Sequence, residues 1–351
     1  MKRELIDLLA CPRTGSALCL RQARFDRSGD IVAGELFSRG GPSYPIIAGV
    51  PDFVGGLSDD ASGLTVAAFG RQWRRFDRQS GFMASRELFL SNVPSLAGDA
   101  LKGATVLEGG CGSGRWLRAA AELGARMVVG LDASEAVHVS RHNCRELPQV
   151  HVVRGTLEQP PFRRGFDAAF SIGVIHHLDE PWSGIAGLLG CIAPGGRAAI
   201  WTYAREGNGT YLALARILRR ITPGIPEPLL ASLSWAMTIP LYAHARSTNR
   251  LLAATRVPFP LRDYIAMLGR LEFRDLWNVV YDQLAPRITH FPTGRELRGW
   301  IERAGGRIDS LTLRTQNSWC AGIVADRSSE SLSDSSGARV AKARRSIALA
   351  G

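Results

Sequence analysis

The sequence predicts an α/β fold built on a doubly wound, mostly parallel sheet, because strand patterns alternate with helical patterns from Thr105 onward. Two buried strands, "TVLEGG" and "RMVVGLDAS", enclose the helix "RWLRAAAELG", which ends at Gly124. Further strands are expected at "QVHVVRGT", "FDAAFSIGVI" and "RAAIWTY". In such sheets ligands bind beyond the carboxyl ends of the strands, near the point where the strand order reverses. We therefore expect the functional site immediately after these strands.

The regions around this alternating core differ from it in composition and pattern. The amino-terminal residues are punctuated by Pro and Gly, and the segment after Tyr203 interrupts the strand–helix rhythm. The core resumes at a capping box formed by Thr293 and Glu296. We expect five parts in chain order: a small α+β unit (1–56), the core (62–204), a helical cap with an apolar surface and a basic rim (205–290), the C-terminal part of the core (291–327) and a disordered, Ser-rich tail (328–351).

The charge balance favours anionic partners without naming one. The chain of 351 residues has 43 Lys and Arg against 32 Asp and Glu, a formal net charge of +11. The basic residues are spread along the chain in short groups, so nucleic-acid binding stays an alternative rather than the main prediction. Six scattered cysteines and the lack of an apolar segment at the Met1 end predict a reduced, cytoplasmic protein.

The longest apolar stretch covers residues 229–243. It is shorter than the roughly 20 residues that span a bilayer, and it contains Pro240. It is therefore not predicted to be a transmembrane helix. Two roles stay open for it: a hydrophobic lid over the substrate, or peripheral contact with the inner face of a membrane.

The stretch "TVLEGGCGSGRW" carries the strongest chemical signal. Glu108, Gly110, Gly112 and Gly114 recur at intervals of two residues. A phosphate-binding loop would end in Gly-Lys-Ser/Thr, whereas Arg115 follows the last glycine here. A dinucleotide fingerprint needs a glycine three residues after its second glycine, and none stands there. The loop therefore matches neither of these phosphate-binding patterns.

Together with Asp132 at the end of the second strand, this loop resembles that of the class I S-adenosylmethionine-dependent methyltransferases. The later segments "RGTLEQPPF", "FDAAFSIGVIHHLDEP" and "LLGCIAPGGRAAIWTY" are similar to motifs of that family in the same order. The resemblance implies a Rossmann-like fold with a seven-stranded sheet. It also implies S-adenosylmethionine as the cofactor.

The resemblance further suggests roles around the cofactor. The glycines would let the backbone approach the amino-acid part of the ligand, and Glu108 would offset its positive charge. Asp132 would accept two hydrogen bonds from the ribose hydroxyls. Thr156 stands where the family has an aspartate that holds the adenine amino group, so the Thr156 hydroxyl or the Leu157 backbone is expected there. The expected cofactor-binding residues are Trp73, Glu108, Gly110, Gly112, Gly114, Asp132, Thr156, Leu157 and Ser171.

Histidines are the candidate bases for an acceptor that must lose a proton. His176 and His177 follow the fourth strand, beside the expected methyl donor, and His290 precedes the capping box. For each of them, a hydrogen-bonded histidine that holds a loop is the competing interpretation. The sequence "SIGVIHH" lacks the Asn/Asp-Pro-Pro-Tyr pattern of amide and adenine methylation, and it has no cysteine for the covalent route to pyrimidine carbon.

Residues 1–56 resemble the small activator protein that partners tRNA and translation-factor methyltransferases, through "LLACPRTGSALCL" and "YPIIAGVPDFV". Zinc-binding relatives carry a Cys-x-x-Cys pair there, but Thr14 stands at the second position after Cys11, and the next cysteine is Cys19. We therefore expect no bound metal and a docking or stabilising role for this unit.

These observations predict a methyltransferase that acts on a small-molecule or lipid-linked acceptor, with oxygen as the expected nucleophile. The apolar cap with its basic rim is the reason for this choice of acceptor. Two alternatives stay open. The chain could be an RNA or protein methyltransferase that docks its substrate through the N-terminal unit, or an inactive cofactor-binding partner subunit.

Overall fold

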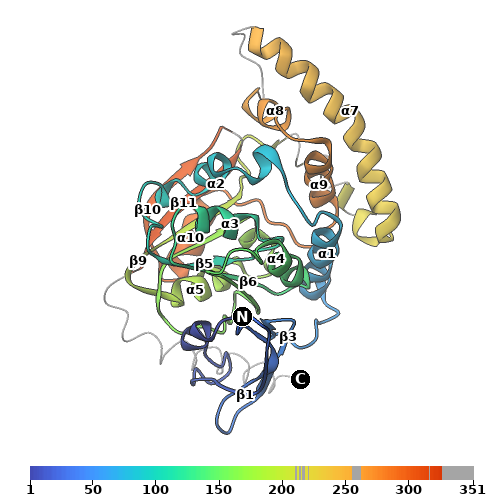
Figure 1. Cartoon of the computed structure of the whole chain (residues 1–351). Helices are drawn as coiled ribbons and strands as arrows, with labels where there is room; N and C mark the ends of the chain where they lie inside the picture. Colours follow the sequence, from blue (N-terminus) through green and yellow to red (C-terminus); the bar gives the residue numbers. More distant parts are fainter. Residues whose placement is uncertain are drawn as a thin grey trace, which may run out of the picture.

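The computed structural model contains a large mixed sheet with helices on both faces, a small antiparallel sheet, and a group of helices beside the core (Figure 1). It describes residues 1–209, 212, 215, 218, 219, 221–254, 262–315 and 317–325. The tail that the sequence predicts to be disordered, residues 328–351, lies outside these ranges.

The large sheet has seven strands in the order β10-β11-β9-β8-β5-β6-β7. They are β5 (Thr105–Gly109), β6 (Met127–Asp132), β7 (Val150–Arg154), β8 (Phe166–Ile172), β9 (Ile192–Tyr203), β10 (Arg307–Leu313) and β11 (Ser318–Val324). Strands β9, β8, β5, β6 and β7 pair in parallel, whereas β11 runs antiparallel to β9 and β10. The strand order reverses beside β5. The predicted doubly wound, mostly parallel, seven-stranded sheet is confirmed.

Both faces of this sheet are buried, which explains why its strands read as nearly continuous apolar runs. The neighbours Val106 and Leu107 on β5 pack into different hydrophobic cores. The core that contains Val106 also contains Trp116, and the core that contains Leu107 also contains Ile185 and Leu297. The helices of the core are α1 (Ala61–Arg75), α2 (Arg86–Asn92), α3 (Arg115–Glu122), α4 (Ala136–Asn143), α5 (Pro181–Gly190) and α10 (Gly294–Arg303), with short 3-10 helices η2 (Gly81–Ala84), η3 (Pro94–Leu96) and η4 (Ile175–His177).

A group of helices lies between β9 and α10 in the chain. Its described members are η5 (Thr222–Gly224), α7 (Glu227–Ala254), α8 (Arg262–Leu268) and α9 (Phe273–Leu284). Helix α7 runs along the outside of the molecule, and Trp235 and Ile239 on it are each 46% exposed (Figure 1). In the described part of the chain, no helix has the length and apolar character needed to cross a membrane.

The N-terminal unit is a small antiparallel sheet in the order β1-β2-β3-β4. Its elements are η1 (Arg3–Leu8), β1 (Cys19–Phe25), β2 (Ile31–Phe37), β3 (Ser43–Ile47) and β4 (Val50–Pro51). Main-chain bonds join it to the core, because the Ala10 amide donates to the Pro161 carbonyl at 3.0 Å and the Arg163 amide donates to the Leu8 carbonyl at 2.8 Å. Its apolar residues belong to the same hydrophobic core as those of β5 and β6. The unit and the core therefore share one interior.

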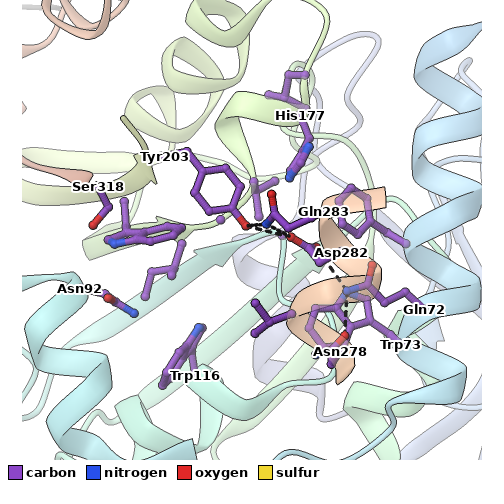
Figure 2. A pocket seen from close by; sticks show the side chains of 18 of the residues that line it. Gln72, Trp73, Asn92, Trp116, His177, Tyr203, Asn278, Asp282, Gln283 and Ser318 are labelled. Carbon is purple, nitrogen blue, oxygen red and sulfur yellow. Dashed lines mark hydrogen bonds between the residues drawn. The ribbon is translucent and has the colours of Figure 1, made fainter. Parts of the chain in front are cut away.

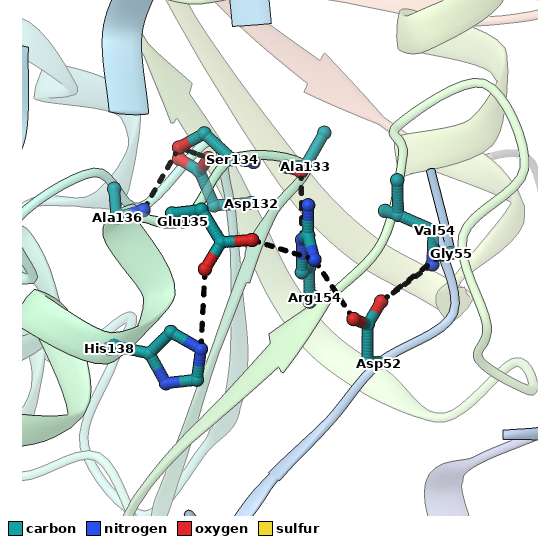
Figure 3. Close-up of polar contacts among 10 residues, drawn as sticks. All are labelled: Asp52, Val54, Gly55, Asp132, Ala133, Ser134, Glu135, Ala136, His138 and Arg154. Atoms are coloured by element: carbon teal, nitrogen blue, oxygen red, sulfur yellow. Dashed lines mark hydrogen bonds and ion pairs between the residues drawn. The ribbon is translucent and has the colours of Figure 1, made fainter. Parts of the chain in front are cut away.

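Arg154, the last residue of β7, ties this unit to the core (Figure 3). Its guanidinium donates to the Asp52 carboxylate at 2.9 Å and pairs with Glu135 at 2.8 Å. It also donates to the Ala133 carbonyl at 3.2 Å. The loop that follows Asp132 is therefore braced from the side of the N-terminal unit.

Candidate active site

The glycine loop between β5 and α3 turns the chain sharply at the point where the strand order reverses. Gly110, Gly112 and Gly114 have φ angles of +80°, +50° and +84°, a region that other residues rarely adopt. A Cβ atom at Gly110 would overlap Val174, and one at Gly112 would lie 2.8 Å from the Trp73 ring. The loop needs glycine for its own packing, whether or not a ligand is bound.

Beyond β5 lies a cavity of about 760 Å³, with walls from α1, α9 and the loops that follow the parallel strands (Figure 2). This volume is within the range of small-molecule and cofactor sites. Six predicted site residues line it: Trp73, Gly110, Asp132, Thr156, Leu157 and His177. Six others do not: Glu108, Gly112, Gly114, Ser171, His176 and His290. At Gly112 and Gly114 the close contacts are with the protein's own Trp73 and Ser140 rather than with the cavity.

Asp132 is held rigidly at the edge of the cavity. Its Oδ2 accepts from the Gly112 amide at 2.9 Å, and its Oδ1 accepts from the Ser134 amide at 2.9 Å and the Ser134 hydroxyl at 2.6 Å. Burial raises the pKa of Asp132, and these hydrogen bonds oppose that rise. A carboxylate offers about four acceptor positions. The described hydrogen bonds fill three of these positions, so about one is left for the predicted contact with a ribose.

Thr156 and Leu157 form the adjoining wall, after β7. The Thr156 hydroxyl accepts from the Gln159 amide at 3.3 Å, and it also forms a hydrogen bond with the Glu158 carboxyl, which opposes the rise that burial causes in the pKa of Glu158. The Leu157 side chain packs against Gly109, where a Cβ atom would lie 2.6 Å from it. The wall therefore places the polar side chains of Thr156 and Glu158 beside the apolar surface of Leu157.

Glu108 lies beneath the loop rather than in the cavity. It is 1% exposed, and neither of its carboxyl oxygens has a hydrogen-bond partner among the residues that the structure describes. Burial raises the pKa of Glu108 well above 4.5, and the positive charge of Arg115 only partly opposes this. The neutral form is therefore favoured. This placement does not fit the predicted role, in which Glu108 offsets the charge of the ligand.

His177 is the one of the three candidate bases that reaches the cavity. Its Nδ1 lies 2.8 Å from the Ile288 carbonyl, which can only accept, so Nδ1 carries the proton and Nε2 presents a lone pair. Its ring packs edge-on against Phe69, with 4.8 Å between centroids. Burial lowers the pKa of His177, while Asp282 opposes this. The lowered pKa favours the neutral ring, which is the form a base requires.

The other candidates serve as packing and loop contacts. His176 is fully buried, and neither of its ring nitrogens has a hydrogen-bond partner in the described ranges. His290 lies 3.1 Å from the Leu178 carbonyl through Nε2, and its amide donates to the His176 carbonyl at 2.7 Å. The Ser171 hydroxyl donates to the Gly109 carbonyl at 2.8 Å. None of the three side chains lines the cavity.

A polar network that the sequence did not reveal lines the cavity where α1, α9 and β9 meet it (Figure 2). The Asp282 carboxylate accepts from the Tyr203 hydroxyl at 2.9 Å and from the Gln72 amide at 3.2 Å. Gln72 also donates to Asn278 at 2.9 Å, and Gln283 donates to the Tyr203 hydroxyl at 2.7 Å. Asn278 and Asp282 are four residues apart, so they share one face of α9. This spacing of two polar residues on one helix face is the feature of the sequence that could have indicated the network.

Aromatic rings form the part of the cavity that we call the aromatic chamber: Trp201, Tyr203, His177 and Phe291. Trp201 and Tyr203 project from the same side of β9 because they are two residues apart. The Tyr203 and Phe291 rings are stacked at 14°, with 5.4 Å between centroids. Such a chamber suits a flat, unsaturated acceptor.

No bound metal was expected from the cysteine spacing. In the structure the Cys11 thiol is buried, 3.2 Å from the Tyr44 hydroxyl, whereas Cys19 is exposed. The described ranges contain no cluster of three His, Cys, Asp or Glu side chains suited to a metal ion.

Comparison with known proteins identifies the core. Residues 107–200 match a family model described as a methyltransferase domain. The tRNA U34 carboxymethyltransferase of Azotobacter vinelandii is 32% identical over 117 residues, which cover 32% of this chain and 37% of that protein. The enzyme of the same name from Pseudoalteromonas translucida is 36% identical over 113 residues, 31% of this chain and 34% of that protein. The chain thus matches only about a third of the length of these relatives.

Solved structures show more distant similarity. A complex of the Haloferax volcanii Trm112 methyltransferase activator with a methyltransferase aligns with a TM-score of 0.45 and 16% identity, covering 77% of this chain and 100% of that one. Magnesium protoporphyrin IX methyltransferase from Synechocystis PCC 6803 aligns with a TM-score of 0.43 and 17% identity, covering 73% and 94%.

The relatives correct the predicted acceptor and partners. The sequence favoured a small-molecule or lipid-linked acceptor and left membrane contact through residues 229–243 open, whereas the curated relatives carry the name of a tRNA-modifying enzyme. The predicted apolar cap is the reason that the sequence favours a small-molecule or lipid-linked acceptor. Part of that apolar surface turns inward, since Leu230 and Ala231 of α7 pack with Phe76 and Tyr281 in a hydrophobic core of their own.

The family match, the strand order and the cavity beside the glycine loop agree with one another. Asp132, Thr156 and Leu157 line that cavity, and the match to a methyltransferase domain supports S-adenosylmethionine as the cofactor. Residues 107–200 therefore match a methyltransferase domain, and they lie within the Rossmann-like fold that the sequence predicts.

Proposed function

We propose that this chain is an S-adenosylmethionine-dependent RNA methyltransferase that acts on a nucleotide turned out of its RNA strand. One observation carries the proposal: the cofactor wall at Asp132 and the aromatic chamber at Tyr203 belong to one continuous cavity. The names of the curated relatives support RNA as the acceptor. The aromatic chamber matters because an enzyme that modifies a base must reach that base outside the stack of its strand.

The aromatic chamber can replace the stacking that a base loses when it turns out of its strand. Stacking on an aromatic side chain contributes roughly 1–3 kcal/mol per base, comparable to the few kcal/mol needed to unstack it. Trp201, which lines the cavity beside the Tyr203 ring, offers such a face. A saturated lipid would gain burial there but none of the stacking.

The residues of the chain would align the acceptor and take up its proton. S-adenosylmethionine supplies an activated methyl group. Alignment of two reactants can contribute about 7–11 kcal/mol to lowering a barrier. Nε2 of His177 is positioned to accept a proton, and the nearby Asp282 carboxylate would stabilise the resulting imidazolium. The Tyr203 hydroxyl, bonded to Asp282 at 2.9 Å, connects this pair to the chamber.

The proposal predicts transfer of labelled methyl groups from S-adenosylmethionine to a total tRNA pool. His177→Gln should lower the rate by about 10²- to 10⁴-fold, the usual contribution of a positioned base, without changing cofactor affinity. Mass analysis of the digested nucleosides checks the transfer and tells methyl from carboxymethyl products. Calorimetry checks the cofactor affinity.

His142→Gln is the matched control, because His142 is exposed on α4 and outside the cavity. It should retain the wild-type rate. Normal cofactor binding with no label in any RNA would contradict the proposed function. A His177→Gln rate equal to wild type would contradict the role given to His177 while leaving the acceptor class in place.

A further inference from the structure

Helix α1 has two chemically different faces. Its inner face lines the cavity with Phe69, Gln72 and Trp73. Its outer face carries Arg71 and Arg74, and Arg78 follows just beyond the helix end; all three are exposed. We call these three arginines the α1 basic stripe. In Figure 1, α1 lies between α9 and the N-terminal unit, at the surface of the molecule. The stripe is therefore separated from the cavity by the width of one helix, about 10–12 Å.

The positive charge of the stripe is not neutralised by neighbouring carboxylates. Asp77 pairs with Arg274 at 2.7 Å, and Glu227 pairs with Arg75 at 2.7 Å. For the stripe itself, no carboxylate of the described residues lies within 4.0 Å of Arg71, Arg74 or Arg78. Nearby acids are thus used by other cations, and the outer face keeps its charge.

Stabilisation of α1 explains only part of this pattern. A cation in the last helical turn interacts favourably with the helix dipole, which accounts for Arg74 and Arg75. Arg71 lies a turn earlier, where the dipole effect has faded, and Arg78 lies outside the helix. A stabilised helix end would not require cations at these two positions.

We propose that the α1 basic stripe binds the phosphate backbone of the RNA whose nucleotide enters the cavity. This inference rests on the proposed function and adds the docking surface to it. Arg71 and Arg74 are about one turn apart, a rise of about 4.5 Å, so both side chains can contact phosphates of the same strand. Phosphate contacts position a strand without reading its sequence. The stripe therefore sets where the strand lies, and the aromatic chamber receives the base.

The test compares RNA binding by the full chain with and without the stripe. Affinity for a total tRNA pool should fall as salt is added. The triple variant Arg71→Gln, Arg74→Gln, Arg78→Gln should make the plot of log affinity against log salt shallower by about 2, because each phosphate contact contributes roughly 0.7–0.9 to the steepness of this plot. Near physiological salt the loss of affinity should be roughly 10- to 100-fold. Thermal stability should fall only by the small helix-dipole contribution of Arg74, and S-adenosylmethionine binding should stay at the wild-type value, which shows that the cavity is intact.

A matched triple variant removes three exposed arginines of the N-terminal unit: Arg24→Gln, Arg27→Gln and Arg39→Gln. Both triples lower the formal net charge from +11 to +8, so overall charge is equal between them. The matched variant should keep the wild-type salt slope. Equal losses in both triples would show a general charge effect, and a larger loss in the N-terminal triple would place docking on that unit. Either result would contradict the proposal that the α1 basic stripe binds the RNA backbone.

The outcome for the wild type separates this inference from the proposed function. A wild-type chain that neither binds nor modifies any tRNA contradicts the proposed function itself. A wild-type chain that modifies tRNA, together with a stripe variant of unchanged salt slope, contradicts the docking surface alone.

Discussion

At the scale of single residues, two carboxyl groups near the glycine loop differ in how the protein uses them. Asp132 receives three hydrogen bonds and stays at the edge of the cavity. Glu108 receives none from the described residues and is 1% exposed. An acidic residue in a motif can thus be a ligand-facing acceptor or a buried acid, and burial with hydrogen bonding decides which.

The burial of Glu108 predicts a pH effect on stability. Its folded-state pKa lies well above 4.5, whereas the unfolded chain keeps the ordinary value. The stability contribution of the neutral acid is complete below the ordinary value and is lost as the pH rises through the folded-state pKa. Glu108→Gln removes this loss. Relative to wild type, its thermal midpoint should rise as the pH increases above about 5, by roughly 1–2 °C for each 1 kcal/mol recovered in a chain of this length.

Glu302→Gln is the control, because Glu302 is exposed on α10. Its midpoint relative to wild type should stay nearly constant over the same pH range. A Glu108→Gln midpoint that falls relative to wild type as the pH rises would show that the carboxylate form is the one the fold requires.

At the scale of elements, α1 joins the cofactor loop to the cap. Trp73 lies over Gly112, while Gln72 donates to Asn278 at 2.9 Å and to Asp282 at 3.2 Å on α9. Residues 72 and 73 are neighbours, so one turn of α1 contacts both walls of the cavity. A change in the packing of this turn should therefore alter the packing, and with it the stability, of the glycine loop.

A double-mutant cycle tests this contact. Gly112→Ala places a Cβ atom 2.8 Å from the Trp73 ring and in a φ of +50°. The overlap should contribute about 1–3 kcal/mol of destabilisation and the left-handed backbone about 1–2 kcal/mol. In a Trp73→Ala background only the backbone part should remain. Urea unfolding of the four proteins measures both values, and strictly additive effects would show that Trp73 does not rest on the loop.

At the scale of the whole molecule, the N-terminal unit is part of the methyltransferase core rather than a tethered module. Leu9 belongs to the same hydrophobic core as Leu107 and Val129 of the large sheet. The pair Asp52–Arg154 joins the two parts, with each side chain about 10% exposed. Because the interior is shared, the unit and the core should unfold together.

Asp52→Ala tests that link. Removing one partner of a buried ion pair typically destabilises by 3–5 kcal/mol, and Arg154 keeps Glu135 as a second partner at 2.8 Å, so we expect about 3 kcal/mol. Calorimetry should show a single transition at a lower temperature. Glu35→Ala, which removes an exposed pair with Arg21 on the same unit, should shift the midpoint far less. Two separate transitions in the wild type would contradict the shared interior.

The sheet, the position of its switch point and the glycine loop could be predicted without any knowledge of the tertiary structure, because strand and helix periodicity and positive-φ positions are local properties of the chain. The apolar runs around Leu107, Val129 and Phe170 needed no partner to be recognised as buried strands. The location of Asp132 at the end of β6 followed from the same pattern, and so did its place at the cavity edge.

Which side chains meet depends on how distant segments of the chain pack against one another. His176 and His177 are neighbours in sequence, yet one is enclosed and the other lines the cavity. Asp282 and Tyr203 are far apart in sequence, and their bond of 2.9 Å depends on how α9 packs beside β9. Side-chain direction and contacts between distant segments arise from packing of the whole chain, and no local period encodes them.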